Sequence, residues 1–315
     1  MVVHADWSTD ARKRWMARGE WTANGRYRAA APEPVGDPRT LVDRTRQSTG
    51  ASKGALLGFD FPIGLPREYA TRAGIDDFRA FLVEAGSGTW RDFYSVARQR
   101  EEISLQRPFY PQRPGNTQQA YLLAGLGVAA LDDLRRLCER SYAGRRAACP
   151  LFWTLGGQQV GKGAISGWTD VIAPAVRQSA ERIALWPFDG PLDVLCGEGR
   201  TVLSETYPAE FYAHLGVAFS PSRSGMRSGK RVRSDRAANA TALCAWASAA
   251  GVELSPELEE QLGDGFGARA DGEDRFDAVI GLFGMLNIVL GYRAAGGPPD
   301  EPARRVEGWI LGQAA

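Results

Sequence analysis

Three acidic side chains stand at the ends of short apolar runs in this chain. Asp6 closes the run VVHAD, Asp60 follows ALLGF, and Glu205 closes TVLSE. An ionised carboxylate is rarely buried unless a cation or several donors compensate it, because removing it from water costs several kcal/mol. Each of these acids therefore meets either the hydrogen-bond donors of a turn or a metal ion.

A second acidic pair opens the most apolar segment of the chain, DRFDAVIGLFGMLNIVL. Asp274 and Asp277 lie three residues apart, which places them on one face of the predicted helix. They could cap that helix or complete a metal site. With only two histidines in the chain, carboxylate oxygens favour Mg²⁺ or Mn²⁺ over zinc. The predicted metal ligands are Asp6, Asp60, Glu205, Asp274 and Asp277.

The order of the first elements explains how two of these acids can meet. The sequence predicts strands at 2–7, 13–21 and 26–31, a helix at 37–48 and a fourth strand at 54–61. A right-handed crossover can place the fourth strand beside the first. Asp6 and Asp60 would then be neighbours, and two carboxylates in a dry setting require a divalent cation or a shared proton between them.

The remaining pattern predicts an α/β fold with one mixed sheet, three antiparallel strands followed by parallel strands, flanked by helices. Further strands are expected at 183–188 and 202–205, and further helices at 170–181, 208–215 and 274–290. Residues 67–150 read as a mostly helical insertion. No long flexible linker borders the insertion, so we expect residues 1–315 to form a single domain.

Two basic segments are candidates for phosphate binding. GGQQVGKG fits the G-x-x-x-x-G-K template, but Gly163 stands where a P-loop has the Ser or Thr that binds Mg²⁺. Either this is an ordinary glycine-rich connection, or Lys162 contacts a substrate phosphate. The run SRSGMRSGKRVRSDR predicts a loop that is solvated or follows a nucleic-acid backbone, with Lys230, Arg231 and Arg233 as the contacts.

Composition and charge narrow the class of protein. The chain has 315 residues, 44% of them hydrophobic, and a formal net charge of +1. Its four cysteines form no Cys-x-x-Cys pair, so neither a zinc site nor a disulfide framework is indicated. The N-terminus reaches an acid before any adequate apolar run, and the longest apolar segment, 278–290, is shorter than the ~20 residues a bilayer requires. We expect a cytoplasmic protein without a membrane partner.

Several short blocks together resemble a known family. The blocks are HADWS at 4–8, GFDFPIGLP at 58–66, SETYPAEFYAHLG at 204–216, DRFDAVIGLFGML at 274–286 and EGWIL at 307–311. They resemble the domain of unknown function 429 family, whose members are regarded as predicted nucleases of the RNase H-like superfamily. The resemblance covers nearly the whole chain in order and implies an RNase H-like domain carrying the 67–150 insertion.

The resemblance also implies roles for individual acids. It makes Asp6, Asp60, Glu205 and Asp277 the catalytic acids of a nuclease that holds two divalent ions ~4 Å apart and hydrolyses phosphodiesters in nucleic acid. Two alternatives remain open: a catalytically inactive nucleic-acid-binding or scaffold protein, and an ATP-dependent phosphotransferase of the same fold. The phosphotransferase would use a glycine-containing hairpin after the first acid, whereas Asp6 is followed by WSTDARKR.

Overall fold

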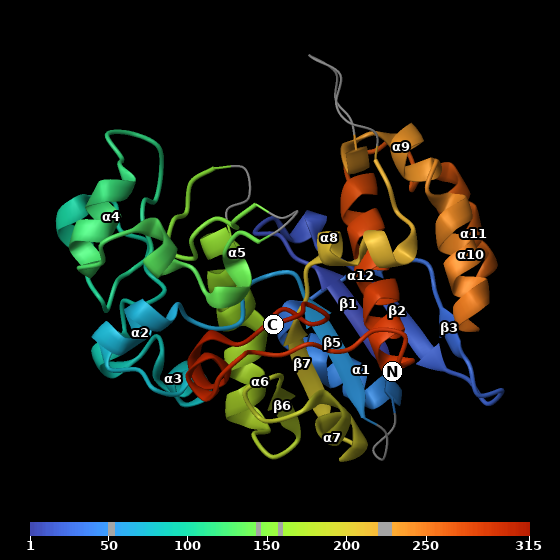
Figure 1. Cartoon of the computed structure of the whole chain (residues 1–315), viewed down its shortest axis with the longest axis horizontal. Coiled ribbons are helices and arrows are strands. Elements are labelled where there is room, and N and C mark those ends of the chain that lie inside the picture. Colours follow the sequence, from blue (N-terminus) through green and yellow to red (C-terminus); the bar gives the residue numbers. More distant parts are fainter. Residues whose placement is uncertain (50–53, 143–145, 157–159, 220–228) are drawn as a thin grey trace.

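A single mixed sheet forms the centre of the protein (Figure 1). The computed structural model describes residues 1–49, 54–142, 146–156, 160–219 and 229–315. Within these residues the sheet has eight strands in the order β6-β7-β5-β1-β2-β3-β8, with β4 paired to β2. The strands are β1 Val2–Asp6, β2 Trp15–Trp21, β3 Tyr27–Ala29, β4 Glu33–Pro34, β5 Ala55–Phe59, β6 Ile183–Leu185, β7 Thr201–Glu205 and β8 Glu253–Leu254.

The pairing confirms the predicted mixed sheet. β1 runs antiparallel to β2, and β2 runs antiparallel to β3. β5 lies parallel to β1, and β7 lies parallel to both β5 and β6. The two-residue strands β4 and β8 were not predicted, because segments this short carry no readable alternation of apolar and polar residues.

Helices cover both faces of the sheet. They are α1 Leu41–Thr49, α2 Arg67–Ala73, α3 Phe78–Glu84, α4 Gln119–Leu126, α5 Val160–Gly167, α6 Ala173–Gln178, α7 Leu192–Gly197, α8 Pro208–Phe211, α9 Arg233–Ala237, α10 Ala240–Ala250, α11 Pro256–Asp264 and α12 Gly272–Val289. The predicted apolar helix is α12, which packs across β1 and β2 (Figure 1).

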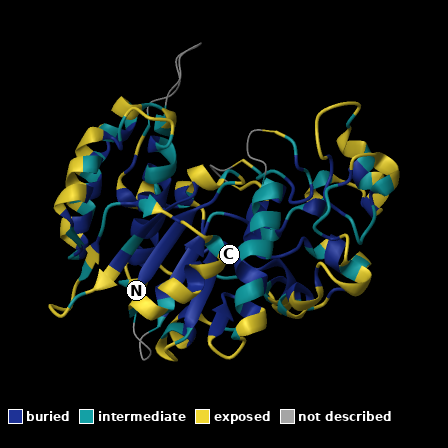
Figure 2. Ribbon diagram, turned by 180° about the vertical axis from the view of Figure 1, so that it is seen from behind, coloured by how far each residue is buried: buried dark blue, intermediate teal, exposed yellow. Residues whose placement is uncertain are grey.

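Side-chain alternation divides the core into two layers. Leu57 and Phe59 of β5 point into the layer formed with α1, α6 and the insertion. Leu56 points into the layer formed with α12, α10 and α11. Figure 2 shows the strands buried between these helices, whose outer surfaces are exposed. Because successive residues of a strand face opposite sides, each acid at a strand end belongs to one layer or the other.

The insertion is less helical than predicted. Helices α2, α3 and α4 are short, and the described residues at 85–118 and 127–150 contain only brief 3₁₀ turns. The prolines in the run RPFYPQRP lack an amide hydrogen and interrupt any longer helix. Phe109 and Tyr110 of this run are buried against aromatic neighbours and belong to the core of the insertion.

An ordinary connection was one interpretation of the glycine-rich segment. In the structure its residues from Val160 onward are helical and form α5. Its glycines permit close packing: a Cβ on Gly161 would lie 2.3 Å from the carbonyl oxygen of Leu151, and one on Gly167 would lie 2.4 Å from the Phe61 ring. Tertiary packing therefore overrides the low helix propensity of glycine. Residues 157–159 of the phosphate-loop template lie outside the described residues.

Across the described ranges of the chain, no helix combines the length and apolarity needed to cross a membrane.

The contact between α12 and β1 requires glycine at position 281. A Cβ there would lie 2.3 Å from the imidazole of His4, which is buried in β1. We expect Gly281→Ala to lower the free energy of unfolding by about 1–3 kcal/mol through overpacking. The control is Gly263→Ala in α11, where a Cβ meets nothing within 4 Å; it should raise stability by roughly 0.5–1 kcal/mol. Urea unfolding of both variants tests this, and equal stability would contradict it.

Candidate acidic site

Asp6 and Asp60 meet at the carboxyl ends of neighbouring parallel strands. Ala5 of β1 lies opposite Phe59 of β5, so the next residue on each strand is an acid at the same level. The two carboxyls lie close enough for each to shift the pKa of the other. The backbone N–H of Trp7 donates to Oδ1 of Asp60 over 2.6 Å. The structure therefore brings together the two acids that the strand order predicted to be neighbours.

Asp277 reaches the same place from α12. It is buried, its Oδ2 contacts the ammonium of Lys230, and the hydroxyl of Tyr212 lies 3.5 Å from its Oδ1. The Lys230 Nζ also lies 3.5 Å from Oε1 of Glu273. The positive charge of Lys230 thus lies against two carboxylates, those of Asp277 and Glu273. We call Asp6, Asp60, Asp274 and Asp277 the acidic cluster.

Asp274 is the outermost member of the acidic cluster. It lies one turn before Asp277 on α12 and is half-buried. Its Oδ2 is buried and has no hydrogen-bond partner in the described part of the chain. Partial burial raises the pKa of Asp274 to about 6, while the positive charge of Lys13 opposes that rise. An unpartnered carboxylate oxygen beside three other acids is a free ligand position.

Burial shifts the titration of the whole cluster. It raises the pKa of Asp60 to about 7, against the opposing effect of the Trp7 hydrogen bond. Burial, and then repulsion from Asp60 and Asp277, raises the pKa of Asp6 well above its ordinary value. Burial also raises the pKa of Asp277, although Lys230 opposes it. The cluster therefore retains protons near neutral pH, and a cation can replace them.

Glu205 does not join the acidic cluster, and the prediction that placed it there is wrong. It lies opposite Phe59 in the ladder of β5 and β7, so it shares the face of Phe59, whereas Asp60 points to the other face. Both of its oxygens accept hydrogen bonds of 2.6 Å from Arg136, and its Oε2 also accepts the N–H of Ile63 over 2.7 Å.

The predicted phosphate-binding residues are distributed unevenly. Lys230 lies in the acidic cluster, and Arg231 lies 3.9 Å from Glu273 beside it. Lys162 lies on α5 one turn before Ser166, whose hydroxyl accepts the indole N–H of Trp7, so it is on the face directed towards the strand ends. Arg233 instead binds the carboxylate and backbone oxygen of Asp264. The earlier part of this basic run, 220–228, lies outside the described residues.

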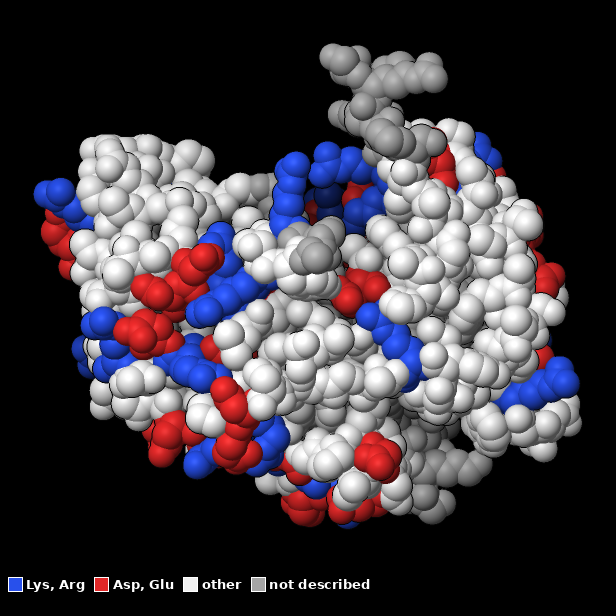
Figure 3. All heavy atoms as spheres, viewed as in Figure 1, with Lys and Arg blue, Asp and Glu red and all other residues white. Residues whose placement is uncertain are grey.

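Charge on the surface surrounds this end of the sheet. In Figure 3, Lys and Arg atoms gather near the top of the molecule around a hollow in which acidic atoms are visible. This region lies between α5 and the first turn of α12 in Figure 1. An acidic interior with a basic rim is suited to a polyanion that brings a phosphate to a cation-binding centre.

Three functional residues were missed from the sequence. Lys13 is the last residue of the 3₁₀ turn Ala11–Lys13, which follows β1, and its positive charge acts on Asp274. Its place in the basic run ARKR, shortly after Asp6, was the signal that could have identified it. Tyr212 stands within the block SETYPAEFYAHLG, four residues after Pro208, but nothing in the block marked it as a partner of Asp277. Arg136 gave no signal, because nothing in its local sequence shows that a distant strand end will bind it.

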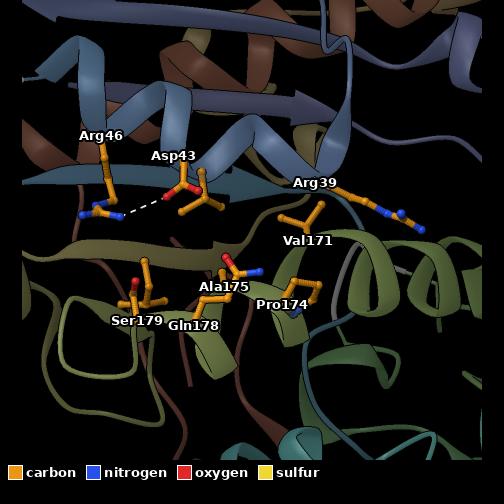
Figure 4. A pocket seen from close by; sticks show the side chains of 10 residues that line it. Arg39, Asp43, Arg46, Val171, Pro174, Ala175, Gln178 and Ser179 are labelled. Atoms are coloured by element: carbon orange, nitrogen blue, oxygen red, sulfur yellow. Dashed lines mark hydrogen bonds and ion pairs between the residues drawn. The ribbon is translucent and has the colours of Figure 1, made fainter.

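The hollow between α1 and α6 is separate from the acidic cluster (Figure 4). Arg39, Asp43 and Arg46 line it from the side of α1, and Arg46 is paired with Asp43 over 3.0 Å. Its volume is about 10 Å³, which is room for a single water molecule. It is too small to bind a substrate.

The acidic cluster has the donor chemistry of a hard-cation site. Its ligand atoms are carboxylate oxygens, which suit Mg²⁺ or Mn²⁺, and Asp274 offers a buried oxygen without a partner. In the described ranges, no three His, Cys, Asp or Glu side chains are arranged as a group ready to hold a metal. The ammonium of Lys230 instead contacts Asp277, and burial raises the pKa of both Asp6 and Asp60, which favours their protonated, uncharged forms.

Comparisons of this chain with protein-family models, with curated proteins and with solved structures gave no match.

Proposed function

We propose that the protein is a metal-dependent nuclease with an RNase H-like domain, which hydrolyses phosphodiester bonds at the acidic cluster. The observation that carries this proposal is the convergence of Asp6, Asp60 and Asp277 from β1, β5 and α12. Asp6 and Asp277 are buried and Asp60 is half-buried. Acids brought together from three elements that are distant in sequence repel one another and raise the free energy of the folded state. The binding of a cation explains why the fold brings these repelling acids to one point.

The proposed cofactor is Mg²⁺ or Mn²⁺. Asp6, Asp60 and Asp277 would hold it, with Asp274 as an auxiliary ligand, because Glu205 is committed to Arg136. When bound, the ions activate water and stabilise the departing oxygen of the phosphodiester. The sequence predicted two ions, and these four acids would have to supply the side-chain ligands of both.

The protein's own residues supply orientation and charge. The Trp7 amide fixes the rotamer of Asp60 through Oδ1. With a pKa of about 7, the Asp60 carboxyl loses its proton near neutral pH, and the resulting carboxylate can bind a cation. Lys230 is positioned to neutralise negative charge that develops on the phosphate once Asp277 binds a cation. Lys162 and Lys13 extend the basic rim on two other elements.

Nucleic acid is the proposed partner, because a backbone of regularly spaced phosphates matches a basic rim around an acidic centre. All four cysteines are free, as is usual in a reducing compartment, and we propose a cytoplasmic location.

One observation favours a second function, a nucleic-acid-binding protein without catalysis. The ammonium of Lys230 already neutralises Asp277, and the acids are not arranged as a ready metal group in the described residues. A chain that had lost its cofactor would show this compensation. The ATP-dependent phosphotransferase has no such support, because the turn after Asp6 contains no glycine to wrap nucleotide phosphates.

A substrate panel separates these functions. Labelled single-stranded and double-stranded DNA, RNA and their hybrid are incubated with the protein and either Mg²⁺, Mn²⁺ or EDTA. We expect cleavage of at least one substrate with a divalent ion and none with EDTA. Binding of nucleic acid without cleavage under all conditions would support the second function. If the protein neither cleaves these substrates nor binds Mn²⁺ in calorimetry, the proposed nuclease function is wrong.

A further inference from the structure

A second buried ionic group lies on the opposite face of the sheet from the acidic cluster. Its centre is Arg136, a fully buried residue of the insertion. Arg136 donates to both oxygens of Glu205 over 2.6 Å and to Oε1 of Glu139 over 2.9 Å. Burying three such charges together is costly unless their hydrogen bonds are nearly complete. The group therefore has a role that apolar packing alone would not supply.

The partners of this group are the backbone atoms that follow Asp60. Glu205 accepts the N–H of Ile63 over 2.7 Å, and Arg136 donates to the carbonyl oxygen of Ile63 over 3.2 Å. One residue earlier, the carbonyl oxygen of Pro62 accepts the indole N–H of Trp168 over 2.6 Å. Pro62 and Ile63, the second and third residues after Asp60, are thus held by side chains from β7, from the insertion and from the segment between α5 and α6.

The C-terminal segment closes the same region. Arg136 also donates to the carbonyl oxygen of Glu307 over 3.1 Å, and the N–H of Leu65 bonds to the carbonyl oxygen of Val306. Gly64 has φ +140°, and a Cβ on it would lie 2.0 Å from the carbonyl oxygen of Glu307. This turn therefore has no space in which to shift while its anchors remain in place.

We propose that Glu205 and Arg136 are positioning residues for Asp60. They fix the turn at 61–64, and the turn fixes the direction in which the Asp60 carboxyl leaves the end of β5. Glu205, which the sequence suggested as a metal ligand, acts on the acidic cluster through the backbone instead. The insertion is by this account part of the site, because Arg136 belongs to it. The catalytic meaning of this inference rests on the proposed nuclease function, whereas the positioning itself does not.

The Trp7 amide provides a direct readout of Asp60. Its N–H donates to Oδ1 of Asp60, and Trp7 directly follows β1, a strand to which neither Glu205 nor Arg136 belongs. If Asp60 shifts, this hydrogen bond weakens and the Trp7 amide exchanges its hydrogen faster. A role confined to local stability would speed the exchange of the Ile63 amide and leave that of Trp7 unchanged.

The variants separate positioning from general stabilisation. Glu205→Leu removes the acceptor of Ile63 and leaves Arg136 paired with Glu139, whereas Glu205→Gln keeps one acceptor oxygen. The matched control is Asp189→Leu, because Asp189 likewise binds an arginine of the insertion, Arg79, and accepts the N–H of Leu185 over 2.7 Å. Neither partner of Asp189 belongs to the turn after Asp60.

Hydrogen exchange is measured by NMR in EDTA and corrected for the overall stability of each variant. We expect Glu205→Leu to speed exchange of the Trp7 amide about tenfold or more and Asp189→Leu to stay close to wild type, with Glu205→Gln in between, because glutamine keeps the acceptor of Ile63 but loses one of the two oxygens that bind Arg136. Should Glu205→Leu fail to fold, Arg136→Lys takes its place, because lysine keeps the charge but cannot bind both oxygens of Glu205; the same rise is expected. An unchanged Trp7 rate in the folded variant would overturn the proposal.

Calorimetric titration with Mn²⁺ keeps the two proposals apart. If wild type binds Mn²⁺, Glu205→Leu should weaken that binding by roughly tenfold, in line with the effect of residues that orient metal ligands. If wild type binds no Mn²⁺ while the Trp7 amide responds as expected, the nuclease function fails and the positioning stands. Wild-type affinity in a folded Glu205→Leu variant would overturn the positioning.

Discussion

Asp60→Asn is expected to reduce phosphodiester cleavage by a factor on the order of 10²–10³ or more, while the protein remains folded. Asparagine has nearly the same shape as aspartate, and its carbonyl oxygen can still accept the Trp7 N–H, as Asp60 does over 2.6 Å. Its amide can donate to the carboxylate of Asp6, which follows at the neighbouring strand end. The variant therefore preserves the contacts of Asp60 and removes only its negative charge.

The loss of charge matters because a divalent cation needs it. Asp60 and Asp6 lie at neighbouring strand ends and together present the buried negative charge of the two strands. A neutral amide oxygen is a weaker ligand for Mg²⁺ or Mn²⁺ than a carboxylate. The rate is measured on whichever labelled substrate wild type cleaves, over a range of Mn²⁺ concentrations, and the affinity for Mn²⁺ should fall together with the rate.

Glu260→Gln is the control for this substitution, since it also replaces a carboxylate by its amide, but on the exposed face of α11. It should cleave at the wild-type rate. Cleavage by Asp60→Asn at the rate of Glu260→Gln would remove Asp60 from the catalytic site.

The parts of the site that sequence could predict are those set by strand order. An acid directly after the first strand and another after the fourth become neighbours once those strands pair in parallel, and β1 and β5 do so. The helix of Asp277 was also readable, because a long apolar run must cross the sheet, as α12 does. In each case the local pattern and the packing agree.

The error at Glu205 has a different physical origin. Its position at a strand end was read correctly, but the face it occupies depends on the register between β5 and β7, where it lies opposite Phe59. A shift of one residue would have turned it to the face of Asp60. That register cannot be predicted from the sequence alone. The sequence also does not show that Arg136, which is distant along the chain, compensates the negative charge of Glu205.

The helix α5 shows how packing can reverse a local preference. Glycine is among the poorest helix formers, and the segment from 160 to 167 contains three of them. Two of these glycines lie where the carbonyl oxygen of Leu151 and the ring of Phe61 leave no space for a Cβ. The close approach that brings α5 to the strand ends is possible only with glycine, and propensity alone cannot anticipate it.

The second large effect expected is on stability, which should fall as the pH rises from about 4 to about 7 in the absence of divalent ions. Burial raises the pKa of Asp60 to about 7 and the pKa of Asp274 to about 6, and it raises those of Asp6 and Asp277 in the same direction. The folded protein thus holds protons that the unfolded chain has released, so its free energy of unfolding decreases with pH in this window. Lys230 has a raised pKa and stays charged throughout.

The size of the effect follows from Asp60, whose pKa rises to about 7. Each pKa unit corresponds to about 1.4 kcal/mol, so we expect a loss on the order of 2–4 kcal/mol between pH 5 and pH 8. Asp60→Asn should flatten this slope and be more stable than wild type at pH 8, whereas Glu260→Gln should retain the slope. Urea unfolding at several pH values in EDTA measures all three proteins.

Divalent ions should reverse the loss, because they bind the deprotonated cluster of the folded state. At a Mn²⁺ concentration about 100 times its dissociation constant, the expected gain is about 2.7 kcal/mol at pH 8. The gain should shrink at pH 5, where protons compete for the same oxygens. It should also be absent in Asp60→Asn, since the amide neither binds the ion well nor carries the charge that the ion compensates. A wild-type protein whose stability is equal at pH 5 and pH 8, and unaffected by Mn²⁺ at either, would show that Lys230 alone balances the cluster.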